Sequence, residues 1–170
     1  DLPGAPAAAV LALAETPSPH DRRRSTAGAL AGVRVWIVDD DVDAHEVVSL
    51  TLRQAGAEVQ TFDSSRELAA ALEAKLAQEP PAVLLIDLAM PGEDGFAALR
   101  RVRSIEMAGG GERSTPAIAL TAFTQIERER LMASGFVDRV DKPVDADKLI
   151  AAIRAALKTE QRGERRSMAS

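Results

Sequence analysis

Four short apolar runs in the sequence each end at polar residues that can handle phosphate. In chain order these polar residues are Asp39 with Asp40, Asp87, Thr121 and Lys142. Carboxylate oxygens are the ligands that a hard divalent cation such as Mg²⁺ prefers, whereas a hydroxyl and an ammonium can hold phosphate oxygens. Brought together, such groups have the chemistry to capture a phosphoryl group on a carboxylate.

The order of apolar and polar segments indicates which elements position these residues. Strands are expected over residues 33–38, 58–62, 82–87, 117–121 and 137–141. Helices are expected over residues 43–55, 65–77, 95–105, 125–134 and 145–158. Strands that alternate with helices predict a parallel α/β sheet covered on both faces. Right-handed crossovers favour the doubly wound, flavodoxin-like (βα)5 fold with strand order 2-1-3-4-5.

The carboxyl ends of parallel strands lie on one edge of the sheet, where ligands bind in such folds. Asp39, Asp40 and Asp87 are therefore expected to be neighbours. Two carboxylates about 4 Å apart repel by about 4 kcal/mol at an effective dielectric of roughly 20, so the cluster favours a bound cation. Asp87 stands alone at the end of the central strand and is the natural nucleophile, which would give an aspartyl phosphate.

Composition and charge limit the classes of protein to which the chain could belong. The chain has 170 residues, no cysteine and a net charge of −5, which fits one domain and argues against a broad nucleic-acid surface. No apolar stretch approaches the roughly 20 residues of a membrane span, so a cytoplasmic domain is expected. Residues 1–31 are expected to be a disordered Ala/Pro-rich linker, residues 32–158 the folded domain, and residues 159–170 a polar tail that frays.

Four motifs together resemble the receiver domain of two-component response regulators, over about residues 31–158. They are Val38-Asp39-Asp40-Asp41, the segment Leu85-Ile86-Asp87 to Gly95, Leu120-Thr121-Ala122, and Asp141-Lys142-Pro143-Val144-Asp145. The resemblance implies that Asp87 is the phosphorylated residue. It also implies that Mg²⁺ or Mn²⁺ is held by Asp40, Asp87, the backbone carbonyl of Ala89 and, through water, Asp39.

The resemblance assigns roles to the remaining strand ends as well. Thr121 is expected to reorient toward the phosphoryl group and Lys142 to pair with it, and the peptide bond after Lys142 is expected to be cis. At Arg139 the family has an aromatic residue or histidine that turns inward on activation, so here we expect Arg139 to stay solvent-facing and contact a partner. Neither Ala89 nor Phe123 can activate a hydrolytic water, which predicts slow dephosphorylation.

The sequence also favours one biological context. The segment from Gly135-Phe136 to Asp145 is similar to receivers attached to hybrid sensor kinases. We therefore expect a C-terminal receiver that takes phosphate from a sensor histidine kinase or a histidine phosphotransfer protein and catalyses its own phosphorylation and dephosphorylation. The alternatives are a stand-alone response regulator and a receiver-like binding module that is not phosphorylated. No direct nucleic-acid contact is expected, and a phosphorylation-linked dimer is left open.

Two further patterns carry no catalytic prediction. His45-Glu46 matches the dipeptide around the phosphorylated histidine of sensor kinases but lacks the Arg-Thr-Pro continuation, so His45 is expected to be a surface residue of its helix. Gly109 to Gly111 lack the Lys-Ser/Thr that follows the glycines of a P-loop, and they are expected to form a loop without a nucleotide site.

Overall fold

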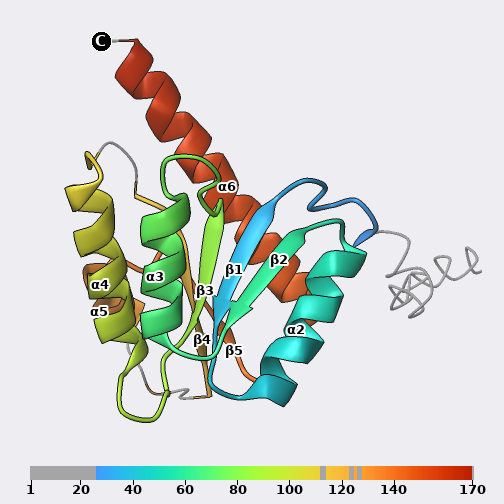
Figure 1. Cartoon of the computed structure of the whole chain (residues 1–170). Coiled ribbons are helices and arrows are strands. Elements are labelled where there is room, and N and C mark those ends of the chain that lie inside the picture. The colour runs from blue at the N-terminus through green and yellow to red at the C-terminus, as the bar shows by residue number, and fades with distance from the viewer. Residues whose placement is uncertain (1–25, 112–113, 123–124, 126–127, 170) are drawn as a thin grey trace, which may run out of the picture.

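Five parallel strands form a single sheet in the computed structural model, in the order β2-β1-β3-β4-β5 (Figure 1). The strands are β1 (Arg34–Val38), β2 (Glu58–Phe62), β3 (Val83–Asp87), β4 (Ala117–Thr121) and β5 (Asp138–Asp141). The helices are α2 (Val42–Gln54), α3 (Ser65–Lys75), α4 (Gly95–Ala108), α5 (Arg128–Ala133) and α6 (Ala146–Met168). The structure describes residues 26–169 except 112–113, 123–124 and 126–127. The predicted fold class and strand order are confirmed.

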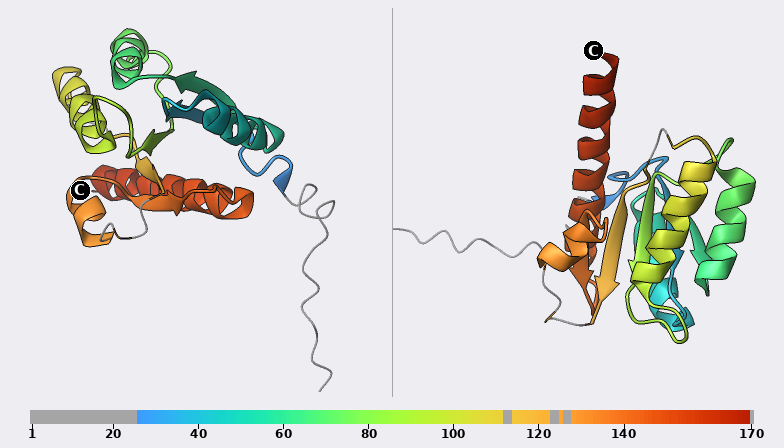
Figure 2. Two further views of the ribbon diagram at one scale, coloured as in Figure 1. Left: turned by 90° about the horizontal axis from the view of Figure 1, so that it is seen from below. Right: turned by 90° about the vertical axis from the view of Figure 1, so that its left-hand side faces the viewer.

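The helices cover both faces of the sheet (Figure 2). Val35 and Ile37 of β1 point to the face on which α2 and α6 pack. Trp36 and Val38 point to the opposite face, which α3, α4 and α5 cover. Successive strand residues face opposite sides, so a strand with both faces buried is apolar along its whole length. For this reason the apolar runs in the sequence predicted the strands to within about a residue of their observed bounds.

Short polar side chains begin four of the helices. Asp41, Ser64, Asp94 and Asp145 each accept a hydrogen bond from the backbone N–H three residues later, at 3.2, 3.2, 2.8 and 3.0 Å. Such N-caps satisfy N–H groups that no carbonyl of the helix can reach. For α3 the cap is Ser64, and Ser65 is the first residue of the helix. The caps thereby determine where the loops at the carboxyl edge end.

The folded domain begins earlier than expected. Leu30 is fully buried, with 0% of its surface exposed, and packs in the core beneath α2 and α6. Its N–H donates to the carbonyl of Ala55 at 2.9 Å, and the N–H of Gly32 donates to Gly56 at 3.2 Å. The apolar side chain of Leu30 thus belongs to the core and not to a linker. Residues 1–25, the rest of the expected linker, lie outside the described residues.

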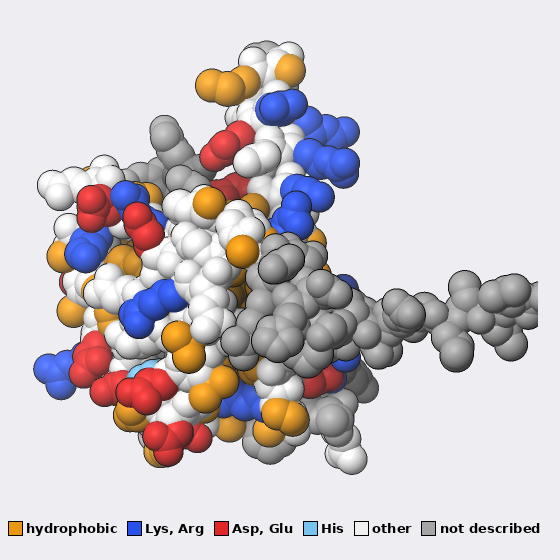
Figure 3. All heavy atoms as spheres, turned by 90° about the vertical axis from the view of Figure 1, so that its right-hand side faces the viewer, with side chains coloured by type: hydrophobic (Ala, Val, Ile, Leu, Met, Phe, Trp, Pro, Cys, Tyr) orange, Lys and Arg blue, Asp and Glu red, His pale blue; other side chains and the backbone are white. Residues whose placement is uncertain are grey.

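The last helix is longer than expected, because α6 continues to Met168, past the expected end at residue 158. Leu149, Ile153 and Ala156 anchor its first half in the core. Residues 161–169 are exposed and extend past the end of the sheet opposite the carboxyl edge, with basic side chains along one side (Figures 1 and 3). Arg, Glu and Gln are good helix formers, which favours helical backbone in this exposed segment. Within the described part of the chain, no helix is long and apolar enough to cross a membrane.

Candidate metal and phosphate site

The turn after β1 places Asp39 and Asp40 at the carboxyl edge of the sheet. Asp39 is 1% exposed, and its Oδ1 accepts a hydrogen bond from the N–H of Asp41 at 3.0 Å. The N–H of Asp39 donates to the carbonyl of Phe62 at 3.1 Å, which ties the turn to the end of β2. Asp40 is exposed. The turn therefore presents one aspartate that is held on several sides and one that solvent can reach.

Asp87 is the last residue of β3, at the centre of the sheet, and it is 4% exposed. Its Oδ1 accepts a hydrogen bond from the N–H of Ala89 at 3.2 Å, which orients the carboxylate. Helix α4 starts against the same loop, since a Cβ on Gly95 would lie 2.5 Å from the backbone carbonyl oxygen of Asp87. A residue without a side chain is needed for this close approach. Gly95 thus helps to place the loop that carries Asp87.

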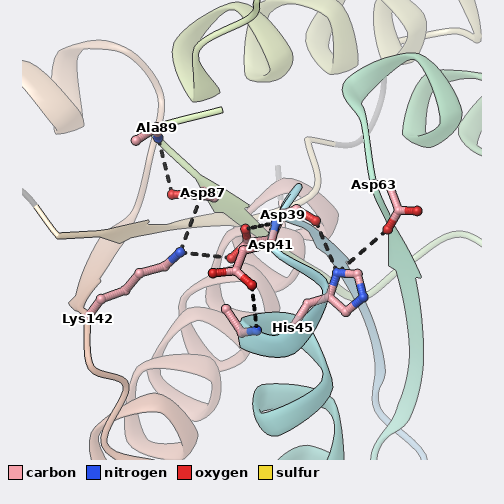
Figure 4. A network of polar contacts seen from close by, with 8 residues as sticks. Asp39, Asp41, His45, Asp63, Asp87, Ala89 and Lys142 are labelled. Carbon is pink, nitrogen blue, oxygen red and sulfur yellow. Dashed lines mark hydrogen bonds and ion pairs between the residues drawn. The ribbon is translucent and has the colours of Figure 1, made fainter. Parts of the chain in front are cut away.

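Lys142 brings a positive charge to the two buried aspartates from the end of β5 (Figure 4). Its Nζ lies 2.9 Å from Oδ2 of Asp39 and 3.4 Å from Oδ2 of Asp87. Its backbone N–H donates to the carbonyl of Thr121 at 2.8 Å. The peptide bond between Lys142 and Pro143 is cis, as the resemblance implied. Strands β4 and β5 together therefore direct this ammonium into the pocket.

The carboxylates of the pocket suit a hard divalent cation. Oxygens of Asp39, Asp40 and Asp87 lie within 4.8 Å of one another. Three carboxylates beside one ammonium leave an excess of negative charge, which a cation would relieve. Mg²⁺ binds through a small number of carboxylates and completes its shell with water or phosphate oxygens. The exposure of Asp40 keeps the cluster open to solvent, so the residues present fit such an ion.

Burial and crowded charges determine the electrostatics of the pocket. Burial raises the pKa of Asp87 above its ordinary value, and the carboxylate of Asp39 raises it further, while the N–H of Ala89 and the charge of Lys142 oppose the shift. Burial alone would lower the pKa of Lys142, but the hydrogen bond and the charge of Asp39, with a contribution from Asp87, outweigh it and raise that pKa. Lys142 is thus protonated, and the charge of Asp87 is disfavoured until a cation neutralises it.

The structure places the other predicted residues at the neighbouring strand ends. Thr121 ends β4, is buried, and lies in register with Asp141 of β5. Arg139, which is expected to face solvent and contact a partner, keeps 20% of its side chain exposed, and its Nη2 lies 2.9 Å from Oδ1 of Asp141, whose side chain is 57% exposed. The carboxylate of Asp141 holds the guanidinium along β5, at the surface of the protein. Phe123 lies outside the described residues.

His45 lies near the site, although the sequence predicted no role for it there. The expectation that it is a surface residue is wrong, because it is 6% exposed and its Nδ1 lies 3.1 Å from the carbonyl oxygen of Asp39 (Figure 4). The available signal was spacing, since His45, Val48 and Leu52 follow the i, i+3, i+7 pattern of one helix face and all three are buried. Val47 of the same helix points away from that face and is 67% exposed.

Known proteins share this sequence pattern. The family model described as the response regulator receiver domain matches residues 35–154. An uncharacterised 14.6 kDa protein of Leptolyngbya boryana is 38% identical over 125 residues, which cover 73% of this chain and 89% of that protein. The DNA-binding transcriptional regulator NtrC of Salmonella typhimurium is 33% identical over 124 residues, which cover 72% of this chain and only 24% of NtrC.

Solved structures share the fold as well. The receiver domain of the histidine kinase CKI1 from Arabidopsis thaliana, crystallised with Mg²⁺ and BeF₃⁻, is similar with a TM-score of 0.65 and 27% sequence identity, over 75% of this chain and 91% of that one. The match to one domain of a longer regulator and to nearly all of a small protein indicates that the shared unit is the domain itself. By its motifs, its acidic pocket and these matches, the chain belongs to the family of receiver domains of two-component response regulators.

Proposed function

We propose that this receiver domain accepts a phosphoryl group on Asp87 from a phosphohistidine, with Mg²⁺ as its cofactor. The observation that carries the proposal is the setting of Asp87, a buried carboxylate at the centre of the carboxyl edge. One of its oxygens is held by the N–H of Ala89 and the other lies 3.4 Å from Nζ of Lys142. These contacts orient the carboxylate before a phosphoryl donor arrives, which favours its role as nucleophile.

In the transfer, an oxygen of Asp87 forms a bond to phosphorus while the bond between phosphorus and the histidine nitrogen breaks. Such reactions depend mainly on positioning and charge neutralisation. Lys142 supplies a positive charge for the phosphoryl oxygens, and the hydroxyl of Thr121 supplies a hydrogen bond. A bound Mg²⁺ would neutralise the remaining negative charge. Asp40, Asp87 and the backbone carbonyl of Ala89 would hold the ion directly, and Asp39 would hold it through water.

Exposed apolar side chains on α2 support a protein as the phosphoryl donor. Val47 and Leu50 lie about one helical turn apart and are 67% and 59% exposed, and Val42 at the start of the helix is 49% exposed. Since α2 begins two residues after Asp40, a partner bound to these side chains would hold its histidine near the pocket. We assign this face to a histidine kinase or a histidine phosphotransfer domain.

The likeness to the receiver of a histidine kinase supports a hybrid kinase in the cytoplasm as the context of this domain. A stand-alone response regulator has the same pocket, so the two contexts differ only in what the domain is attached to. Sequencing of the parent gene on the upstream side of Asp1 distinguishes them. Histidine kinase motifs in that segment are expected for the hybrid kinase.

Incubation with Mg²⁺ and phosphoramidate, followed by measurement of the intact mass, tests phosphorylation directly. Phosphoramidate carries the same phosphorus–nitrogen bond as phosphohistidine. We expect one added phosphoryl group on the wild type and none on Asp87→Asn or in EDTA. Asp94→Asn is the matched control, because Asp94 caps α4 at the surface and Asn caps a helix equally well. An unmodified wild type would contradict the proposal and favour a receiver-like binding module.

A further inference from the structure

His45 of α2 lies against the backbone of the turn that carries the metal-binding aspartates (Figure 4). Its ring is buried, with 6% of the residue exposed. Its Nδ1 lies 3.1 Å from the carbonyl oxygen of Asp39 and 3.9 Å from Oδ1 of Asp63, which follows β2. The proposed phosphorylation reaction does not use this imidazole, so its buried position beside the turn requires another explanation.

The partners of the ring determine where its proton lies. Both atoms that face Nδ1 are oxygens, one of a backbone carbonyl and one of a carboxylate, and both accept hydrogen bonds. Nδ1 therefore carries a hydrogen, and it donates to the carbonyl of Asp39 at the shorter distance. The assignment requires no charge on the ring, because the neutral imidazole protonated at Nδ1 makes the same bond.

The hydrogen bond from His45 completes the set of contacts that hold Asp39. The N–H of Asp39 donates to Phe62, its Oδ1 accepts from Asp41 and its Oδ2 accepts from Lys142. The carbonyl is the remaining polar group of this residue, and it belongs to the peptide unit that joins Asp39 to Asp40. A peptide unit is planar, so a hydrogen bond that holds this carbonyl also sets the direction of the Asp40 N–H and the position of the Asp40 Cα.

We propose that His45 is a positioning residue for the metal site, which holds the peptide between Asp39 and Asp40 and thereby raises the affinity for Mg²⁺. The inference rests on the proposed function, because it takes these aspartates as the metal ligands. Some residues orient the ligands of a metal without binding the metal themselves. Replacing such a residue typically weakens the affinity for the metal by on the order of 10–100-fold. His45 orients the metal-binding turn through a single donor atom, Nδ1, which holds the carbonyl of Asp39.

Two substitutions separate the donor from the bulk of the ring. His45→Asn keeps a nitrogen donor the same number of bonds from Cα as Nδ1, whereas His45→Leu fills the buried space without a donor. Titration of each protein with Mg²⁺, followed by amide NMR shifts, measures the affinity. We expect about tenfold weaker binding for His45→Leu, and an affinity within about twofold of the wild type for His45→Asn. Thermal unfolding of both variants checks that the fold is kept.

The ring itself gives a second measurement that packing alone would not affect. A long-range ¹H–¹⁵N spectrum of the wild type without Mg²⁺ should show a hydrogen on Nδ1 of His45. A ring with no hydrogen on Nδ1 would overturn the inference, as would equal losses of Mg²⁺ affinity in the Asn and Leu variants, or wild-type affinity in His45→Leu. If His45→Leu does not fold, the Asn variant and the spectrum still decide. Failure of the wild type to bind Mg²⁺ would instead contradict the proposed function.

Discussion

Lys142 and Asp39 lie 103 residues apart in the sequence and form an ion pair of 2.9 Å at the carboxyl edge of the sheet. The side chain of Asp39 is 2% exposed and that of Lys142 is 23% exposed. The same ammonium lies 3.4 Å from Asp87. Lys142 thus neutralises part of the negative charge of the acidic pocket, in addition to the role that we propose for it in phosphoryl transfer.

Lys142→Met is expected to destabilise the metal-free domain by about 2 kcal/mol, because it leaves two buried aspartates without their ammonium. Mg²⁺ should then restore more stability in this variant than it adds to the wild type, since the ion replaces the missing charge. Urea unfolding in EDTA and in excess Mg²⁺ measures both effects. Lys148→Met, at an exposed lysine of α6, should behave like the wild type. Equal gains from Mg²⁺ in all three proteins would contradict this role.

Asp87→Asn should gain stability over the wild type as the pH rises, when no metal is present. The folded-state pKa of Asp87 is raised, first by burial, so the folded protein binds this proton more tightly than the unfolded chain does. Wild-type stability therefore falls as the pH rises from the ordinary pKa of an aspartate through the raised one, and Asn has no such loss. Melting temperatures in EDTA across this range measure the difference. A difference that shrinks with rising pH would refute the prediction.

Gly95→Ala is expected to destabilise the domain by about 2 kcal/mol and to slow phosphorylation, because its Cβ would meet the backbone of Asp87 and Leu88 at 2.5 and 2.9 Å. The helix or the acceptor loop must then move. Denaturant unfolding and the rate of phosphorylation by phosphoramidate test the two effects. Gly163→Ala is the matched control, since nothing lies within 4 Å of the Cβ that it adds to the exposed end of α6. It should phosphorylate at the wild-type rate.

Glu106→Ala should cost about 3 kcal/mol of stability without changing phosphorylation. Glu106 is 4% exposed, and it accepts hydrogen bonds from the N–H of Thr115 and from Arg103, both at 2.8 Å. These bonds join the end of α4 to the segment before β4, away from the pocket. Chemical denaturation gives the cost, with the exposed Glu73→Ala as the comparison. A cost below that of Glu73→Ala would show that this cluster contributes little.

Arg139 is expected to keep its pairing with Asp141 after phosphorylation and to serve partner recognition. The distance of 2.9 Å between them places the guanidinium along β5, and no inward rotation of an aromatic side chain is available at this position. Arg139→Ala should therefore be phosphorylated at the wild-type rate. The Nε–Hε signal of Arg139 should shift less on phosphorylation than the backbone amides next to Asp87. A large shift with burial of Arg139 would point to an inward switch instead.

Much of the fold could be predicted because its signals are local. Both faces of β3 are buried, so its run of Val83, Leu84, Leu85 and Ile86 marks a strand without reference to the rest of the chain. Caps such as Ser64 likewise act within one turn of their helix. The boundary at Leu30 and the length of α6 were missed. Leu30 belongs to the fold because α2 and α6 cover it, and that contact has no counterpart in the neighbouring sequence.

Short-range patterns in the sequence predict the strands, the helices and the residues at the carboxyl edge, and the handedness of the crossovers then predicts the strand order. Which of these side chains meet follows from the packing of the folded domain. The pairing of Lys142 with Asp39 depends on how β1 and β5 lie in the same sheet. The contact of His45 with the Asp39 carbonyl depends on the rotation of α2 against that sheet. Distances between side chains on different strands and helices follow from how these elements pack, and they cannot be read from the spacing of residues along the chain.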